Sequence, residues 1–187
     1  MTNPGQTSET SSFSFKITDP DNFTIEEASS GITFTPTAGS FDSLSISLDK
    51  TTINEMGVYY TFTMRPSDVF TSNAQIKITL PAQLSVENEC RISAADDLID
   101  TRASNVDVSF NRIIYIRDAF PDGMPVKKTF SFTLSDFMNA PTIQTTEAFD
   151  VIIFYTEFTD EVSHSTASDT NLMVTSTPST TALTMSA

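Results

Sequence analysis

The sequence predicts an all-β fold, an antiparallel β-sandwich of the immunoglobulin-like type, preceded by a two-strand extension. Apolar residues alternate with Ser, Thr, Lys or Asp along most of the 187-residue chain, and a period of two is typical of strands with one buried and one solvated face. Turn-forming residues separate about eleven such segments at the spacing found in sandwiches. Helical periodicity is weak, and its one candidate, residues 94–98, fits a loop equally well.

Each expected strand shows the alternation in its apolar residues. In chain order these residues are Phe13/Phe15/Ile17, Ile32/Phe34, Leu44/Ile46/Leu48, Val58/Tyr60/Phe62/Met64, Ile76/Ile78/Leu80, Val106/Val108/Phe110 and Phe130/Phe132/Leu134. Two continuous apolar runs, 112–117 and 151–155, predict central strands. Pro81 ends the strand before it, because proline donates no ladder hydrogen bond. Residues 121–123, Pro-Asp-Gly, predict a turn, since proline fixes one dihedral angle and glycine accepts a positive φ.

The end of the chain repeats its beginning. Four residues match at a constant offset of about 136 positions: Asn3, Thr10, Phe13 and Ile17 correspond to Asn139, Thr146, Phe149 and Ile153. Two further blocks follow in the same order and alternation phase at a slightly longer offset, 32–37 with 172–177 and 44–47 with 183–186. Three blocks in order indicate an internal duplication. The chain therefore resembles one repeat of roughly 140 residues plus a third of another, as in a tandem array.

The duplication divides the chain into an N-terminal strand pair, residues 1–40, and a sandwich repeat, residues 41–187. The two strands expected in the first part, 13–17 and 32–37, match strands that lie late in the sandwich. A two-stranded ribbon alone is marginal in water, so its apolar residues need a partner. Assembly contacts are expected at Phe13, Phe15, Ile17, Ile32 and Phe34. The partner is a preceding repeat, the edge of the same sandwich, or a neighbouring chain bound head to tail, which would build a filament.

Composition excludes two classes of function. The net charge is −14 and only 10 residues are basic, so no nucleic-acid partner is expected, because phosphate binding needs clustered Lys and Arg. No apolar run approaches the roughly 18 residues of a membrane-spanning helix. The first residues also lack the charged and apolar regions of a signal peptide. If the protein is secreted, we expect this chain to be a mature piece of a longer precursor.

Candidate catalytic residues are few. Cys90 and His164 are the single cysteine and the single histidine, and such a pair is formally a nucleophile and its base. No protease signature surrounds either residue, and His164 lies in a polar segment expected to form a turn. Cys90 could pair with a cysteine of another chain, but a buried, inert thiol is the commoner fate of a single cysteine. Adjacent acids such as Asp96 and Asp97 are typical of solvated loops, and the absence of Trp disfavours a glycosidase. We expect neither enzymatic activity nor an organic cofactor.

An acidic turn near the N-terminus is the candidate metal site. Asp19, Asp21, Asn22 and Glu26 place hard oxygen donors near one another, and Ca²⁺ takes roughly six to eight oxygen ligands. A bare acidic turn is the alternative, since the EF-hand pattern is absent. Asn22 also begins an N-glycosylation sequon that ends at Thr24, which predicts a glycan in a polar turn.

Six motifs follow one another in a recognisable order. They are GVYYTFT at 57–63, NAQIKITLP at 73–81, NEC at 88–90, FSFTL at 130–134, NAP at 139–141 and TEAF at 146–149. This order resembles the Thr- and Ser-rich immunoglobulin-like tandem repeats of very large surface or secreted proteins of ciliates and other protists. The resemblance implies an extracellular array, coat or fibre and implies no catalytic residues. Cys90 departs from it, because such repeats are expected to carry a second, paired cysteine.

These observations predict a non-enzymatic structural repeat of an extracellular or cell-surface filament, coat or array. Its partners are expected to be copies of itself or adjacent repeats of the same polypeptide. The alternative is an adhesin or carbohydrate-binding module in which acidic loops and calcium hold a glycan. The Thr-, Ser- and Pro-rich segment 175–181 fits either an exposed strand and linker or an O-glycosylated stalk.

Overall fold

The computed structural model describes residues 9–35, 37, 39–67, 69, 72, 74–86, 89–101, 106–124, 128–157, 160–167 and 174–178. The regular structure of these residues is β-strand throughout, in twelve strands. Their bounds are β1 (Phe13–Thr18), β2 (Thr24–Ile32), β3 (Phe41–Leu48), β4 (Val58–Pro66), β5 (Gln75–Thr79), β6 (Ser85–Val86), β7 (Ile92–Ala95), β8 (Val106–Ser109), β9 (Ile113–Ile116), β10 (Phe130–Met138), β11 (Asp150–Glu157) and β12 (Asp160–Ala167). Within this described part, no helix is long and apolar enough to cross a membrane.

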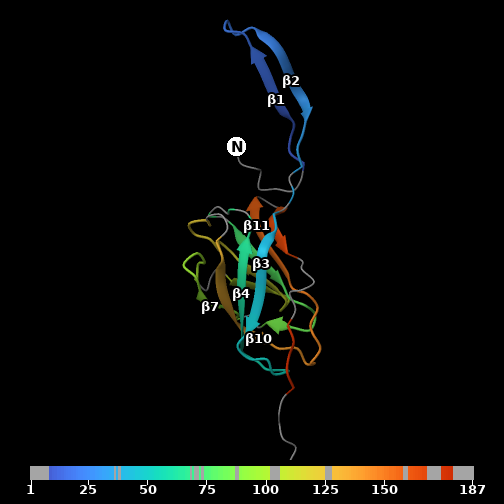
Figure 1. Ribbon diagram of the computed structural model, residues 1–187, viewed down its shortest axis with the longest axis vertical. Helices are drawn as coiled ribbons and strands as arrows, with labels where there is room; N and C mark the ends of the chain where they lie inside the picture. Colours follow the sequence, from blue (N-terminus) through green and yellow to red (C-terminus); the bar gives the residue numbers. More distant parts are fainter. Residues whose placement is uncertain are drawn as a thin grey trace, which may run out of the picture.

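Strands β3 to β12 form a sandwich of two antiparallel sheets (Figure 1). One sheet has the order β3-β4-β10-β6, with β7 also paired to β10, and the other has the order β12-β11-β5-β9-β8. The orders β3-β4-β10 and β12-β11-β5 are those of strands A-B-E and G-F-C in an immunoglobulin domain. The predicted fold class, an all-β antiparallel sandwich of immunoglobulin-like type, is therefore confirmed.

The predicted alternation places the core between the two sheets. In β4, the central strand of its sheet, every second residue is fully buried: Val58, Tyr60, Phe62 and Met64. Strand β10 shows the same pattern, and its register sets Phe132 opposite Phe62 and Leu134 opposite Tyr60. Opposite residues of an antiparallel pair point to the same side of the sheet. The pairing therefore builds one continuous apolar layer.

Aromatic rings fill most of that layer. Tyr60 stacks on Phe137 with ring centres 4.3 Å apart, and Phe62 stacks on Phe132 at 5.4 Å. Phe149, from the segment that leads into β11, lies against both Tyr60 and Phe62 and so joins the two sheets. Each fully buried ring stabilises the fold by about 2–3 kcal/mol, so the sandwich has a core of its own without a disulfide.

The two continuous apolar runs form central strands, as predicted. Strand β9 lies between β5 and β8, and β11 lies between β12 and β5. Their inward residues are fully buried, namely Ile114, Ile116, Val151 and Ile153.

Two local predictions were wrong. The second strand of the N-terminal pair is β2, Thr24–Ile32, and not residues 32–37. The acidic pair Glu26 and Glu27 hides this strand in the sequence, but cross-strand pairing with β1 supplies its backbone hydrogen bonds. His164 lies within β12 and not in a turn, because residues 160–167 pair along β11.

The N-terminal hairpin, strands β1 and β2, forms a separate two-stranded sheet. Figure 1 shows it extending beyond one end of the sandwich, along the long axis of the molecule. Strand β3, which begins at Phe41, is the first strand of the sandwich. The hairpin is thus held out from the sandwich, and both of its broad faces are accessible.

Candidate functional site

One face of the N-terminal hairpin is apolar. In the antiparallel register, Phe13 lies opposite Ile32 and Phe15 lies opposite Ala28. Opposite residues share a face, so Ile17, two residues after Phe15, extends the same surface, and Glu26, its partner in β2, lies beside it. We call Phe13, Phe15, Ile17, Ala28 and Ile32 the apolar face. Lys16 and Glu27, which also lie opposite each other, occupy the other side.

The apolar face is exposed. The exposed fractions are 48% for Phe13, 44% for Phe15, 46% for Ile17 and 44% for Ile32. Phe34, just beyond β2, is 45% exposed. The structure thus places all five predicted assembly residues at the surface of one projecting element. Contiguous exposed apolar surface of this kind marks an interaction site.

The matching residues of the sandwich are buried. Phe149, Val151 and Ile153, which correspond to the three apolar residues of β1, have exposed fractions of 0%. Val174, which corresponds to Phe34, is 6% exposed. The same alternation of apolar residues therefore occurs twice, once inside a core and once without a covering layer.

Hydrogen bonds continue the pairing of the hairpin beyond the start of β1 and the end of β2. The backbone N–H of Thr10 donates to the carbonyl of Phe34 at 2.8 Å, and the N–H of Phe34 donates to Oγ1 of Thr10 at 3.1 Å. The hydroxyl of Thr33 donates to the carboxylate of Glu9. These contacts hold Phe34 beside the apolar face, so that it belongs to the same surface.

The acidic turn closes the hairpin at its far end. Oδ1 of Asp19 accepts hydrogen bonds from the backbone N–H groups of Asp21, at 3.0 Å, and Phe23, at 2.8 Å. Asn22 has a φ of 64°, a conformation that Asn tolerates better than most residues. Asp19 therefore stabilises the turn directly.

The predicted calcium ligands do not all gather at this turn. Glu26 lies in β2 opposite Ile17, whereas Asp19 and Asp21 belong to the turn. Among the described residues, no group of three or more His, Cys, Asp and Glu side chains is arranged to hold a metal ion. Calcium binding stays a prediction. Asn22 and Thr24 of the sequon are both exposed at this tip, where a glycan has room.

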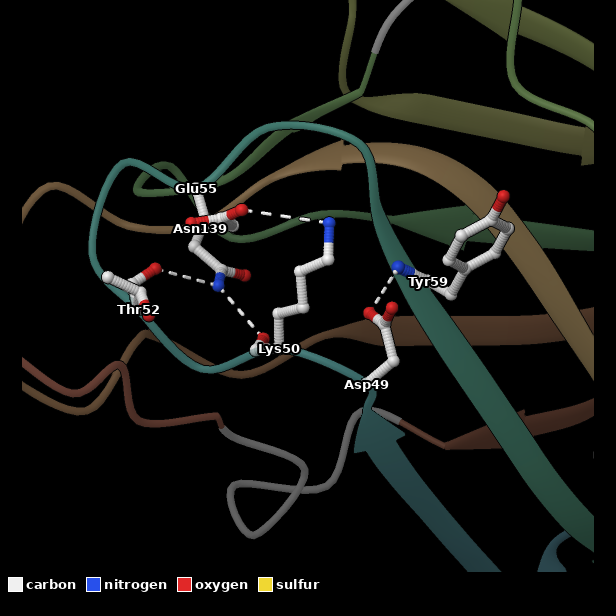
Figure 2. Close-up of polar contacts among 6 residues, drawn as sticks. All are labelled: Asp49, Lys50, Thr52, Glu55, Tyr59 and Asn139. Carbon is white, nitrogen blue, oxygen red and sulfur yellow. Dashed lines mark hydrogen bonds and ion pairs between the residues drawn. The ribbon is translucent and has the colours of Figure 1, made fainter.

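Asn139 is a structural residue that the candidate list from the sequence missed. It lies directly after β10 and is fully buried. Its amide Nδ2 donates to the carbonyls of Lys50 at 3.0 Å and Thr52 at 2.9 Å, as Figure 2 shows. Its Oδ1 accepts a hydrogen bond from the hydroxyl of Tyr60 at 2.9 Å. The match of Asn139 with Asn3 in the duplication was the signal that could have identified it.

The loop between β3 and β4 has further polar contacts, among them backbone hydrogen bonds from Ile53 to Thr177 and from Asn54 to Ala140. The N–H of Tyr59 donates to Oδ1 of Asp49 at 2.7 Å (Figure 2). Lys50 and Glu55 form an ion pair at 3.6 Å, but both side chains are more than a third exposed, and such pairs contribute little. Among these contacts, the amide of Asn139 is the buried side chain that binds two carbonyls of the loop.

Cys90 is buried and chemically quiet. It is 4% exposed, and burial, reinforced by the negative charge of Asp136, raises the pKa of its thiol to about 12. A nucleophilic cysteine needs a lowered pKa. The structure thus confirms that Cys90 is buried, and the raised pKa disfavours a nucleophilic role.

No protein-family model matches the chain, and neither does any curated protein. Among solved structures, the chain is similar to BslA, a bacterial hydrophobin, at 11% identity and a TM-score of 0.48, covering 78% of this chain and 100% of that one. It is similar to the collagen-binding domain of a Staphylococcus aureus adhesin at 9% identity and a TM-score of 0.35, covering 71% and 95%. It is also similar to BcpA, the major pilin subunit of Bacillus cereus, at 15% identity and a TM-score of 0.39, covering 81% and 47%. At these identities, none of the three transfers residue roles to this chain.

Proposed function

We propose that the chain is a non-enzymatic structural repeat of an extracellular or cell-surface filament, coat or array, joined head to tail through the strands of the N-terminal hairpin. The observation that supports this most is the exposed apolar face, whose residues Phe13, Phe15 and Ile17 have fully buried counterparts in the sandwich. A two-stranded sheet cannot bury its own apolar side. A second layer from a neighbouring unit would cover it.

The size of the apolar face favours neighbours held at high local concentration. Its large side chains are already about half covered, so complete burial gains on the order of 1 kcal/mol for each. Five such side chains, counting Ile32 and Phe34, give about 5 kcal/mol, whereas association of free partners costs at least ~4 kcal/mol. Free chains would bind weakly. Units linked in one polypeptide or packed in an array would bind well, because their effective concentration reaches the millimolar range.

The remaining surface suits an extracellular array. A net charge of −14 keeps exposed surface soluble between contacts. A glycan at Asn22 would project from the tip of the hairpin, away from the sandwich below it. Phe23 and Ile25, 71% and 68% exposed, are further apolar residues of the hairpin that lie outside the apolar face.

Association of the purified chain tests the proposal. We expect sedimentation velocity to show weak, concentration-dependent association approaching millimolar concentration, and electron microscopy to show end-to-end contacts. Phe15→Ser is expected to abolish this association. Ile143→Ser is the matched control, since Ile143 is an apolar residue that is 57% exposed in the sandwich. A monomer at all concentrations contradicts association through the hairpin, and a monomer that binds glycans would favour the adhesin alternative.

A further inference from the structure

We propose that the N-terminal hairpin fits one particular partner: a sandwich of the same kind that lacks its own last hairpin, in which β1 and β2 take the positions of β11 and β12. This inference names the partner of the proposed assembly and rests on that function. The partner strand is the equivalent of β5, which in this chain is already covered by β11.

The two hairpins correspond in position, except that the last residues of β11 match the turn that follows β1. Applying the offset of about 136 positions to β11 and β12 gives residues 14–21 and 24–31, which overlap β1 and β2. Figure 1 also shows β1 and β11 pointing the same way along the long axis. A sandwich built around β1 and β2 would therefore lie end to end with the present one. That arrangement propagates along one axis.

The side chains predict how β1 would sit in its partner. In the sandwich, Val151 lies opposite Ile78 and Ile153 lies opposite Ile76. In the same register, Phe15 and Ile17 would lie opposite these two positions of the partner and would face its core. Phe13 would occupy the position of Phe149, which is the same residue type.

Strand β1 also has the edge that this docking needs. Strand β11 pairs with β12 on one side and with β5 on the other. Among the described strands, β1 pairs with β2 alone, so within this part of the chain the edge equivalent to the β5-facing edge of β11 is free to add to a sheet. Phe15 pairs with Ala28, whereas its counterpart Val151 pairs with Ala167, which corresponds to Gly31. This shift of three residues moves β2 along β1 and also reverses the faces of its side chains, so β2 does not reproduce the pairing of β12. The free edge of β1 is unaltered.

One position distinguishes this chain's own sandwich from the best partner. Lys77 lies opposite Ile152 in the sandwich, and the residue of β1 at that position is Lys16. Two lysines directly opposite each other are destabilising. The preferred partner would therefore carry an uncharged or acidic residue where this chain has Lys77.

A fusion protein tests the fit with the complete chain present. Residues 41–148 are placed directly before residues 13–187, so that Phe13 follows Ala148 as Phe149 does in the sandwich. We expect amide hydrogen exchange in β1 to slow at least about 100-fold relative to the single chain, as for strands moved from a surface hairpin into a core. Lys77→Glu in the added segment is expected to slow it further. Phe15→Ser is expected to restore fast exchange.

A second fusion is the matched control. It places residues 41–178 before residue 9, so the added sandwich has its own β11, β12 and buried Val174 and offers no vacant position. Exchange in β1 is expected to stay as fast as in the single chain. If the control folds its added sandwich but β1 stays unprotected in the first fusion, or the added segment there stays unfolded, the inference is wrong. Association of the single chain is measured separately, so the proposed function survives that outcome.

Discussion

The hydroxyl of Tyr60 donates a hydrogen bond of 2.9 Å to Oδ1 of Asn139, and both side chains are fully buried. The bond joins the middle of β4 to the residue that follows β10. Because the amide of Asn139 also holds the carbonyls of Lys50 and Thr52, this single side chain ties a core strand to the β3–β4 loop. Burial also raises the pKa of the Tyr60 hydroxyl, so it remains a donor.

Removing this amide should destabilise the sandwich. Asn139→Ala leaves the hydroxyl of Tyr60 and two loop carbonyls without their partner, and we expect it to lower the free energy of unfolding by about 2–4 kcal/mol. Tyr60→Phe should cost about 1–2 kcal/mol. Lys50→Ala keeps the carbonyl and loses only an exposed ion pair, so its effect should stay within ~0.5 kcal/mol. Urea unfolding of the three variants measures these differences, and equal effects for Asn139→Ala and Lys50→Ala would contradict the role of Asn139.

Matched residues of the two hairpins should differ in their contribution to stability. Val151→Ala removes buried methyl groups, and we expect a loss of about 2 kcal/mol in the unfolding free energy of the sandwich. Phe15→Ala, at the corresponding position of β1, should change it by less than ~0.5 kcal/mol, because Phe15 is exposed. Urea unfolding monitored on the sandwich checks both. A loss of similar size for Phe15→Ala would show that the hairpin docks on its own sandwich.

Cys90 should make the fold sensitive to alkaline pH. Its thiol has an ordinary pKa of 9.0 and a raised pKa of about 12 in the folded state. The unfolded state therefore loses its proton first, so the stability from the protonated buried thiol is complete below pH 9 and declines as the pH rises toward 12. We expect the urea midpoint to fall from pH 9 to pH 10, with a slope of at most about 1.4 kcal/mol per pH unit.

Cys90→Ala is the control for this pH dependence. It will alter stability at every pH, but its unfolding free energy should fall less steeply above pH 9. Tyr60 also has a raised pKa from burial, and it adds to the decline only above its ordinary value of 10.0. Parallel pH profiles for the two proteins between pH 9 and pH 10 would rule out Cys90 as the source.

Glycosylation at the hairpin tip is expected when the chain passes through a secretory pathway. Asn22 and Thr24 are exposed, so the sequon is accessible to the transferase. Intact-mass measurement should show one N-glycan, removed by Asn22→Gln and by Thr24→Ala. An unmodified mass from secreted material would contradict the prediction.

Calcium binding at the acidic turn has a direct test. If Asp19, Asp21, Asn22 and Glu26 bind Ca²⁺, added calcium should slow amide exchange of the turn residues and chelator should reverse the change. Magnesium at equal ionic strength is the control for screening. Unchanged exchange would leave Asp19 with the role that its hydrogen bonds to Asp21 and Phe23 already give it.

The sequence by itself determined most of the strands and which of their side chains point inward, although β12 was expected to be a turn and β6 and β7 were not predicted. Alternation at Val58, Tyr60 and Phe62 predicts both, because a strand exposes successive side chains to opposite faces. The sequence also contains the matching apolar positions of residues 13–17 and 149–153, an observation that needs only residue identity. Strand β2 was not predicted, because Glu26 and Glu27 are of a residue type with a low strand preference. It forms because pairing with β1 supplies its backbone hydrogen bonds.

Only the tertiary structure decided which copy of the repeated pattern is covered. Phe15 and Val151 sit in equivalent patterns, yet one is 44% exposed and the other 0%. Burial depends on a second layer of residues that can lie anywhere in the chain, so local sequence cannot reveal it. Asn139 shows the same limit, since its partners lie 79 to 89 residues away. The alternation specifies a face that must be covered, and the packing of the sheets determines where a cover exists.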